Sequence, residues 1–232
     1  MSLRIPHPME EGATQRTARV SDKRHIAEIN FEAGDHAMPQ DPREIELALS
    51  AARTAWDKYP YLKLRYGERG RRFTDSDSCW LVTLARAPNE AAASKALAWL
   101  RTVLASRGLP TVILEVHLQA IAVRFTEQFG EQAKFEQFLL DLEAERRALF
   151  GAAGRSHLID AFDQCLRSCS GLVVASAAEL ITSAWVDERA SIPGAVAALC
   201  NWLTDAERFS PDWITGVQAL LAELDQMHRQ TA

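Results

Sequence analysis

The chain has 232 residues, 47% of them hydrophobic and 25% charged, a composition typical of a globular protein with a substantial core. Its formal net charge of -5 at pH 7 argues against a general binder of nucleic acid or of anionic membranes, so neither partner is expected. The sequence contains no apolar run of the roughly 20 residues needed for a membrane helix and no signal-peptide pattern. We expect a cytoplasmic protein with reduced cysteines.

Residues 1–40 are polar, contain several prolines and glycines and have little apolar periodicity, so they are predicted to form an N-terminal arm. A first helix is expected from Asp41-Pro42, because an oxygen cap followed by proline at the first helical position is a typical helix start. Pro60 limits this helix.

Four more helices are expected before residue 150, each with an apolar stripe at helical spacing. Gly108 and Gly130 follow two of them and are suited to the left-handed conformation that ends a helix. The expected ranges are Tyr61 (or just after Gly70) to Pro88, Asn89 to Arg107, Pro110 to Phe129, and Glu131 to Phe150.

A glycine-alanine segment, residues 151–154, is the predicted joint between a helical bundle at 41–150 and a C-terminal helical subdomain at 155–232. The fold class predicted is therefore all-α, as one helical bundle or as two packed helical subdomains. In the C-terminal part we expect helices over 156–170 and 171–185, a helix start with a capping box at Thr204 to Glu207, and a last helix from Ser210 to near Arg229.

His117 lies on the apolar side of the helix expected after Pro110, which is how a proximal haem ligand would be presented in a globin-like fold. Trp80 and Trp99 would then line a pocket for a tetrapyrrole or another flat ligand. The alternative is that His117 is a core histidine with a backbone hydrogen bond and that the tryptophans fill the core.

Four arginines form a cluster in the sequence that contains one acidic residue, Glu68. This cluster, Arg65, Arg69, Arg71 and Arg72, could bind an anion or an acidic surface of a partner. The alternative is a solvent-exposed helix end. Catalytic residues cannot be assigned, since no hydrolase, nucleotide-binding, zinc-protease or di-iron motif occurs, and no metal site is predicted. An enzyme is therefore disfavoured, although a metal-dependent enzyme without a recognisable motif stays a third alternative.

The segment RYGERGRRFTDSD (Arg65 to Asp77) and the later ALAWLRTVLASRGLP (Ala96 to Pro110) resemble a helical segment of bacterial regulatory proteins. In that family it lies upstream of a cobalamin-binding domain, and the resemblance covers about residues 59–129. Trp80-Leu81 stands where the family often has an aromatic-histidine pair, and no DxHxxG motif of a cobalamin domain follows. The resemblance implies a sensory or interaction module without the cofactor domain.

These observations predict a regulatory or protein-interaction module that binds a protein partner or a second copy of itself. The arginine cluster at Arg65 to Arg72 and the loop at Arg107 to Pro110 are the expected contacts. A pocket protein for a flat ligand around His117 is the second hypothesis.

Overall fold

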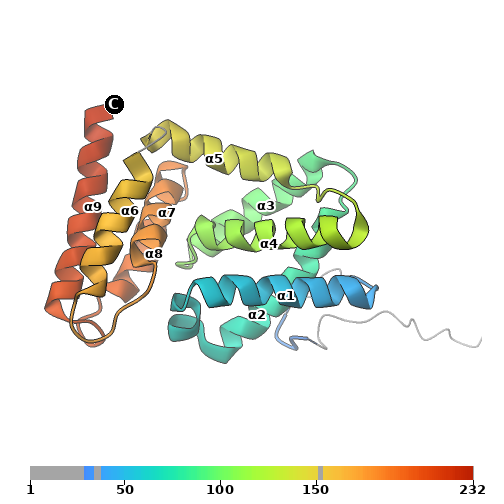
Figure 1. The fold of residues 1–232 in the computed structure, drawn as a ribbon, viewed down its shortest axis with the longest axis horizontal. Coiled ribbons are helices and arrows are strands. Elements are labelled where there is room, and N and C mark those ends of the chain that lie inside the picture. The colour runs from blue at the N-terminus through green and yellow to red at the C-terminus, as the bar shows by residue number, and fades with distance from the viewer. Residues whose placement is uncertain (1–28, 34–37, 151–153, 232) are drawn as a thin grey trace, which may run out of the picture.

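The computed structural model describes residues 29–33, 38–150 and 154–231, and in these ranges it contains nine α-helices and no strand (Figure 1). The predicted all-α fold class is confirmed. Most of the expected N-terminal arm and of the expected joint at 151–154 lie outside the described residues. The helices are α1 (Pro42–Lys58), α2 (Tyr61–Ala85), α3 (Glu90–Ala105), α4 (Thr111–Phe129), α5 (Glu136–Phe150), α6 (Gly154–Arg167), α7 (Ala177–Arg189), α8 (Ala195–Leu203) and α9 (Pro211–Thr231).

Helices α1 to α4 form an N-terminal bundle in which α4 is the central helix (Figure 1). Ten of the residues of α4 are buried, among them Leu118, Ile121 and Phe125, because the helix has neighbours on most of its sides. Helix α5 packs on α3 and reaches α7 and α9, so it bridges to the rest of the molecule. None of the helices in the described part of the chain is long and apolar enough to cross a membrane.

Helices α6 to α9 form a C-terminal bundle around Trp213, which is fully buried (Figure 1). Helix α7 is the central helix here, with an unbroken buried run from Leu180 to Asp187. The core of this bundle also takes in Tyr61 and Val112 from the first turns of α2 and α4. The two bundles thus share buried side chains, and the division into subdomains at 41–150 and 155–232 stays a prediction.

Several helix ends lie where local sequence signals placed them. Asp41 accepts a hydrogen bond from the backbone N–H of Arg43 at 2.9 Å and caps α1. Gly108 and Gly130 have φ values of 82° and 68°, as expected of glycines that follow a helix. Gly108 also meets a spatial requirement, because a Cβ there would lie 2.7 Å from the carbonyl oxygen of Ala198.

Three expected boundaries are wrong, each because tertiary packing decides the local structure. Helix α5 begins at Glu136 and not at Glu131, since the preceding segment runs past α2 and buries Phe135 in the core. Residues 171–176 form a loop before α7. Thr204 to Glu207 starts no helix; Asp205 instead accepts from the N–H of Glu207 in a turn that leads the chain to the buried Phe209.

The bundles meet at the N-terminus of α4, which residues of α7 cap. The backbone N–H of Thr111 donates to Asp187 Oδ2 at 2.9 Å, and that of Val112 donates to Ser183 Oγ at 3.0 Å. Arg101 of α3 donates to Asp187 Oδ1 at 3.1 Å. Burial raises the pKa of Asp187, while its bonds to Thr111 and Arg101 oppose the shift. The contact between bundles is therefore a buried polar network in which both carboxylate oxygens of Asp187 are paired.

Candidate functional site

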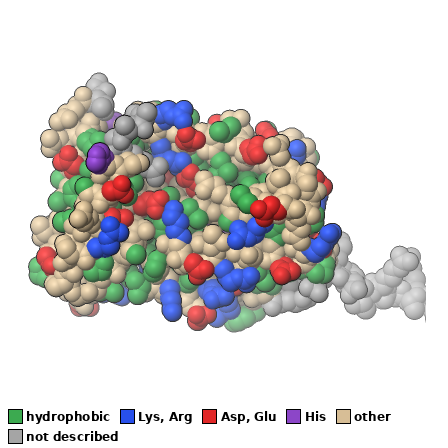
Figure 2. All heavy atoms as spheres, in the orientation of Figure 1, with side chains coloured by type: hydrophobic (Ala, Val, Ile, Leu, Met, Phe, Trp, Pro, Cys, Tyr) green, Lys and Arg blue, Asp and Glu red, His purple; other side chains and the backbone are tan. Residues whose placement is uncertain are grey.

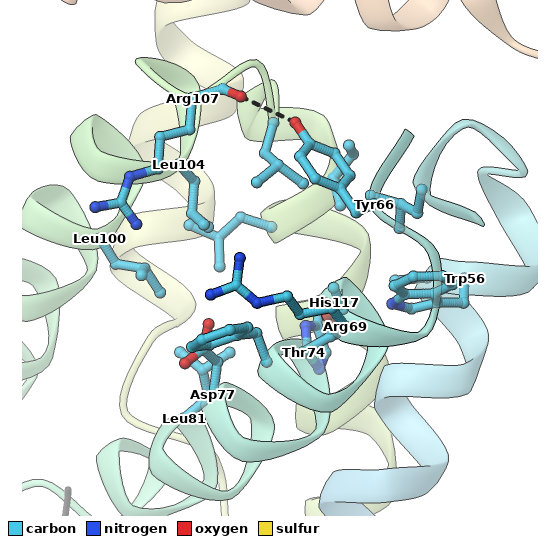
Figure 3. Close-up of a pocket in the computed structure, with 17 residues that line it drawn as sticks. Trp56, Tyr66, Arg69, Thr74, Asp77, Leu81, Leu100, Leu104, Arg107 and His117 are labelled. Atoms are coloured by element: carbon cyan, nitrogen blue, oxygen red, sulfur yellow. Dashed lines mark hydrogen bonds between the residues drawn. The ribbon is translucent and has the colours of Figure 1, made fainter. Parts of the chain in front are cut away.

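A cavity of about 320 Å³ lies between α1, α2, α3 and α4 (Figure 3). Its walls are mainly apolar and aromatic, with Trp56 of α1 and Phe73 of α2 among them. A space of this size and chemistry is typical of small-molecule sites, in which a few polar groups orient an apolar ligand. The other lining residues are Ala55, Leu62, Tyr66, Arg69, Gly70, Thr74, Asp77, Leu81, Leu100, Leu104, Arg107, Leu109, Ile113, Leu114 and His117.

A kink in α2 shapes this cavity. Gly67 has φ 55° and ψ -156°, a conformation that glycine adopts with little strain, and it separates the first turns of α2 from the long remainder. The turns before the kink enter the core of the C-terminal bundle, whereas the remainder packs in the N-terminal bundle. Tyr66, just before the kink, donates through its hydroxyl to the carbonyl oxygen of Arg107 at 2.9 Å (Figure 3). The kink and this bond hold the wall of the cavity against the α3–α4 loop.

His117 is a neutral, buried member of the cavity wall. Burial lowers its pKa to about 4, so the imidazole is uncharged at neutral pH. The single hydroxyl proton of Ser78 is donated to the carbonyl oxygen of Thr74 at 2.6 Å. Ser78 Oγ therefore accepts from Nε2–H of His117 at 2.8 Å. Nδ1 is left as an acceptor, and no hydrogen bond to it from a described residue is present.

Trp56 brings a second incompletely paired group to the cavity. Its Nε1–H is buried and has no hydrogen-bond partner among the described residues. Buried polar groups are nearly always paired, with protein or with bound molecules, because an unpaired donor in a low-dielectric interior is costly. In Figure 3 the indole lies at the edge of the cavity. The nitrogen itself has almost no accessible surface, so an acceptor in the cavity would reach it only if the indole turned.

The charged groups of the cavity wall differ in their partners. Arg69 forms an ion pair with Glu32 at 2.7 Å. Asp77 already takes part in an interaction with the rest of the chain. Arg107 has an exposed side chain, and no ion pair or hydrogen bond of its guanidinium occurs with any described residue. Arg107 thus contributes a positive charge that takes part in no ion pair with a described residue, in a wall that also contains the carboxylate of Asp77.

A second cavity of about 330 Å³ adjoins the first and shares part of its wall. Trp80 and Trp99 line this second space, and Trp99 is 60% exposed. His117 lines only the first one, so the three predicted pocket residues lie around two neighbouring cavities rather than one. The residues common to both walls are Phe73, Asp77, Leu100, Leu104 and Arg107.

The structure distributes the four predicted arginines over different surroundings. Arg65 donates to the hydroxyl of Tyr61 at 2.5 Å and lies over its ring. Arg69 and Arg72 both pair with Glu32, and Arg71 lies 4.0 Å from Asp75. Arg69 and Arg72 thus lie together at Glu32, whereas Arg65 and Arg71 have other partners, and only Arg69 lines the cavity.

Charge and metal chemistry add no further site in the described residues. Basic and acidic side chains are interspersed over the face shown in Figure 2. The described part of the chain contains no group of three or more His, Cys, Asp or Glu side chains that could hold a metal ion. Cys165 and Cys169 are near each other on the surface of α6 and the turn after it, without further potential ligands.

The sequence singled out His117 and the loop that starts at Arg107, and it named Trp80 and Trp99 as the pocket tryptophans. The structure places Trp56, and neither of those two, in the wall of the first cavity together with His117. No sequence signal says that the N–H of Trp56 lacks a partner. Comparison with protein-family models, curated proteins and solved structures gave no match. The resemblance to the helical segment of cobalamin-associated regulators therefore stays a prediction.

Proposed function

We propose that this protein is a small-molecule-binding regulatory module that takes a flat, largely apolar molecule into the cavity between α1 and α4. The observation that carries the proposal is the mainly apolar and aromatic cavity of about 320 Å³, with the uncharged His117 in its wall. The aromatic walls favour a planar body. The neutral His117 offers an acceptor for a donor of the ligand.

The regulatory part of the proposal rests on the contacts that connect the cavity wall with the C-terminal bundle. Tyr66 lines the cavity and bonds to the backbone of Arg107, and Tyr61 donates to the carbonyl oxygen of Gly108 at 2.5 Å. Gly108 in turn lies against the backbone of α8. A ligand that moves the α3–α4 loop would therefore shift contacts with the C-terminal bundle, which would present a changed surface to a protein partner or a second copy.

A haem or another tetrapyrrole is the narrower version of this proposal, and we do not favour it. Nε2 of His117 donates to Ser78, so iron coordination through that nitrogen would require the imidazole to lose its proton-donating bond. An organic ligand without a metal requires no such change. The predicted sensory role agrees with either ligand.

The test uses the full chain and the fluorescent, uncharged probe N-phenyl-1-naphthylamine, whose emission rises in apolar sites. We expect saturable binding with one probe per chain and a dissociation constant in the micromolar range. Leu104→Trp, which places a larger side chain in the cavity wall, should weaken binding at least ten-fold. Leu140→Trp is the matched control, because Leu140 is 58% exposed on α5 and lines neither cavity.

Far-ultraviolet circular dichroism and melting temperature establish that both variants fold. Absence of saturable binding to the wild-type chain would overturn the proposal. Equal binding by Leu104→Trp and Leu140→Trp would also overturn it, because the probe would then occupy some other apolar surface. Native mass spectrometry and an absorption spectrum of the freshly purified untagged protein would reveal a ligand retained from the cell.

A further inference from the structure

We infer that the ligand of this cavity is an amphipathic monoanion, an organic carboxylate or sulfonate whose negative group binds Arg107 while its apolar body enters the cavity. This inference rests on the proposed function and names the chemical class that the site selects. It is carried by the placement of one arginine without an acidic partner at the wall common to both cavities.

Arg69 and Arg107 are the arginines that line the cavity, and of the two Arg107 has no acidic partner among the described residues. Arg53, Arg65 and Arg124 of the same bundle also form no ion pair with a described residue, but they line neither cavity. Arg69 pairs with Glu32, and Arg86 pairs with both Glu44 and Glu131. Most arginine charges of this bundle are thus offset by carboxylates of the same chain. The guanidinium of Arg107 makes no such contact with a described residue, so its binding capacity is unused.

The backbone around Arg107 is fixed although its side chain makes no bond. The residue follows α3, its N–H donates to the carbonyl oxygen of Leu104 at 3.0 Å, and its own carbonyl accepts from Tyr66. The guanidinium is therefore carried on a fixed segment at the side of an apolar space (Figure 3). Such an arrangement favours binding, because little backbone order has to be gained when the anion binds.

The remaining polar groups determine where the charge of the ligand would lie. The uncharged His117 offers an acceptor in the wall, which suits a neutral part of a ligand. Asp77 also lines both cavities and interacts with the rest of the chain. A planar guanidinium binds the two oxygens of a carboxylate or sulfonate through parallel hydrogen bonds, which gives such anions an advantage over neutral analogues.

The experiment compares two probes that share their aromatic body. 8-Anilinonaphthalene-1-sulfonate carries a sulfonate that N-phenyl-1-naphthylamine lacks. We expect Arg107→Gln to lower the affinity for the sulfonate probe about 5–20-fold and to change the affinity for the neutral probe less than about two-fold. Arg107→Lys should keep part of the affinity for the sulfonate probe. Lysine retains the positive charge but cannot donate the two parallel hydrogen bonds of a guanidinium.

Arg229→Gln is the control, since it removes an exposed positive charge near the end of α9, a helix of the other bundle. It should leave the affinities of both probes unchanged within about two-fold. If Arg107→Gln weakens both probes equally, or neither, the inference is overturned while the cavity stands as a binding site. If the neutral probe does not bind the wild-type chain, the proposed function itself fails, and the inference fails with it.

Discussion

The junction between the bundles and the cavity of the N-terminal bundle both bury polar side chains, and they differ in how these are paired. At the junction, both carboxylate oxygens of Asp187 accept hydrogen bonds from Thr111, and Arg101 adds its charge. At the cavity, Trp56 has a buried donor without a described partner, and His117 uses only one of its two nitrogens. The Asp187 carboxylate at the junction is paired within the chain, whereas Trp56 and His117 at the cavity each have a nitrogen without a described partner.

The indole N–H groups of the tryptophans show the same difference in pairing between the two regions. The indole N–H of Trp185 donates to Asp225 at 2.8 Å, and that of Trp213 donates to the carbonyl oxygen of Leu203 at 2.9 Å. Trp56 has no equivalent bond to a described residue. The C-terminal bundle has one exception, the buried hydroxyl of Thr182, which does not line the cavity. Trp56 therefore differs from the two tryptophans of the C-terminal bundle in the pairing of its indole N–H, and it is the one of the three that lines a cavity.

The strongest test of the junction is removal of the Asp187 carboxylate. Asp187→Ala would leave the backbone N–H of Thr111 without its acceptor and Arg101 with less compensation for its buried charge. We expect the free energy of unfolding to fall by about 3–5 kcal/mol, as measured by urea denaturation.

The control for this prediction is Glu143→Ala on the exposed face of α5. Glu143 pairs with Arg147 four residues later, and both side chains are more than half exposed. Removal of such a surface pair should cost less than about 0.5 kcal/mol. A loss of similar size in both variants would show that the junction is not the polar contact that stabilises the arrangement of the bundles.

His117 gives a pH-dependent test of the cavity wall. Burial lowers its pKa to about 4 in the folded chain, from an ordinary value of 6.5. Between these values the unfolded chain binds a proton that the folded chain does not, so its contribution to stability is complete above pH 6.5 and is lost as the pH falls towards 4. The expected loss reaches about 3 kcal/mol at the acid end.

The measurement is urea denaturation of the wild type and of His117→Gln at several pH values from 7 to 4.5. Glutamine has no charge to gain and keeps an N–H donor for Ser78, so the variant should lose less stability on acidification. His157→Gln removes an exposed histidine of α6 and should keep the pH dependence of the wild type. Parallel curves for the wild type and His117→Gln would contradict the buried, neutral state of His117.

The helix pattern was predictable where local chemistry decides it. The oxygen cap at Asp41 and the glycines after α3 and α4 gave correct helix ends, because such signals act within one turn. The loop at 171–176 and the start of α5 were not predictable in this way. They depend on which residues the distant helices bury, as with Phe135 in the core next to α2.

Individual residues of the site could be predicted from the sequence, but not that they come together. The apolar surroundings of His117 follow from helical periodicity, and the loop at Arg107 follows from a helix-ending glycine. Their approach to Trp56 depends on the kink at Gly67 and on the packing of four helices, neither of which has a local signature. The missing partner of Trp56 is a property of three-dimensional neighbours, so sequence alone cannot indicate it.

The smallest predicted effect on stability comes from replacing a tryptophan with phenylalanine. The same substitution can be made in both bundles, so it tests directly whether their indole N–H groups differ in pairing. Trp213→Phe would remove a paired donor from a fully buried position and leave the carbonyl of Leu203 unpaired, at a cost of about 2 kcal/mol or more in urea denaturation. Trp56→Phe would remove a donor that has no described partner, so we expect a cost below about 1 kcal/mol. Equal costs would mean that the Trp56 N–H is already satisfied in the ligand-free chain, which would remove the difference in pairing between the two bundles.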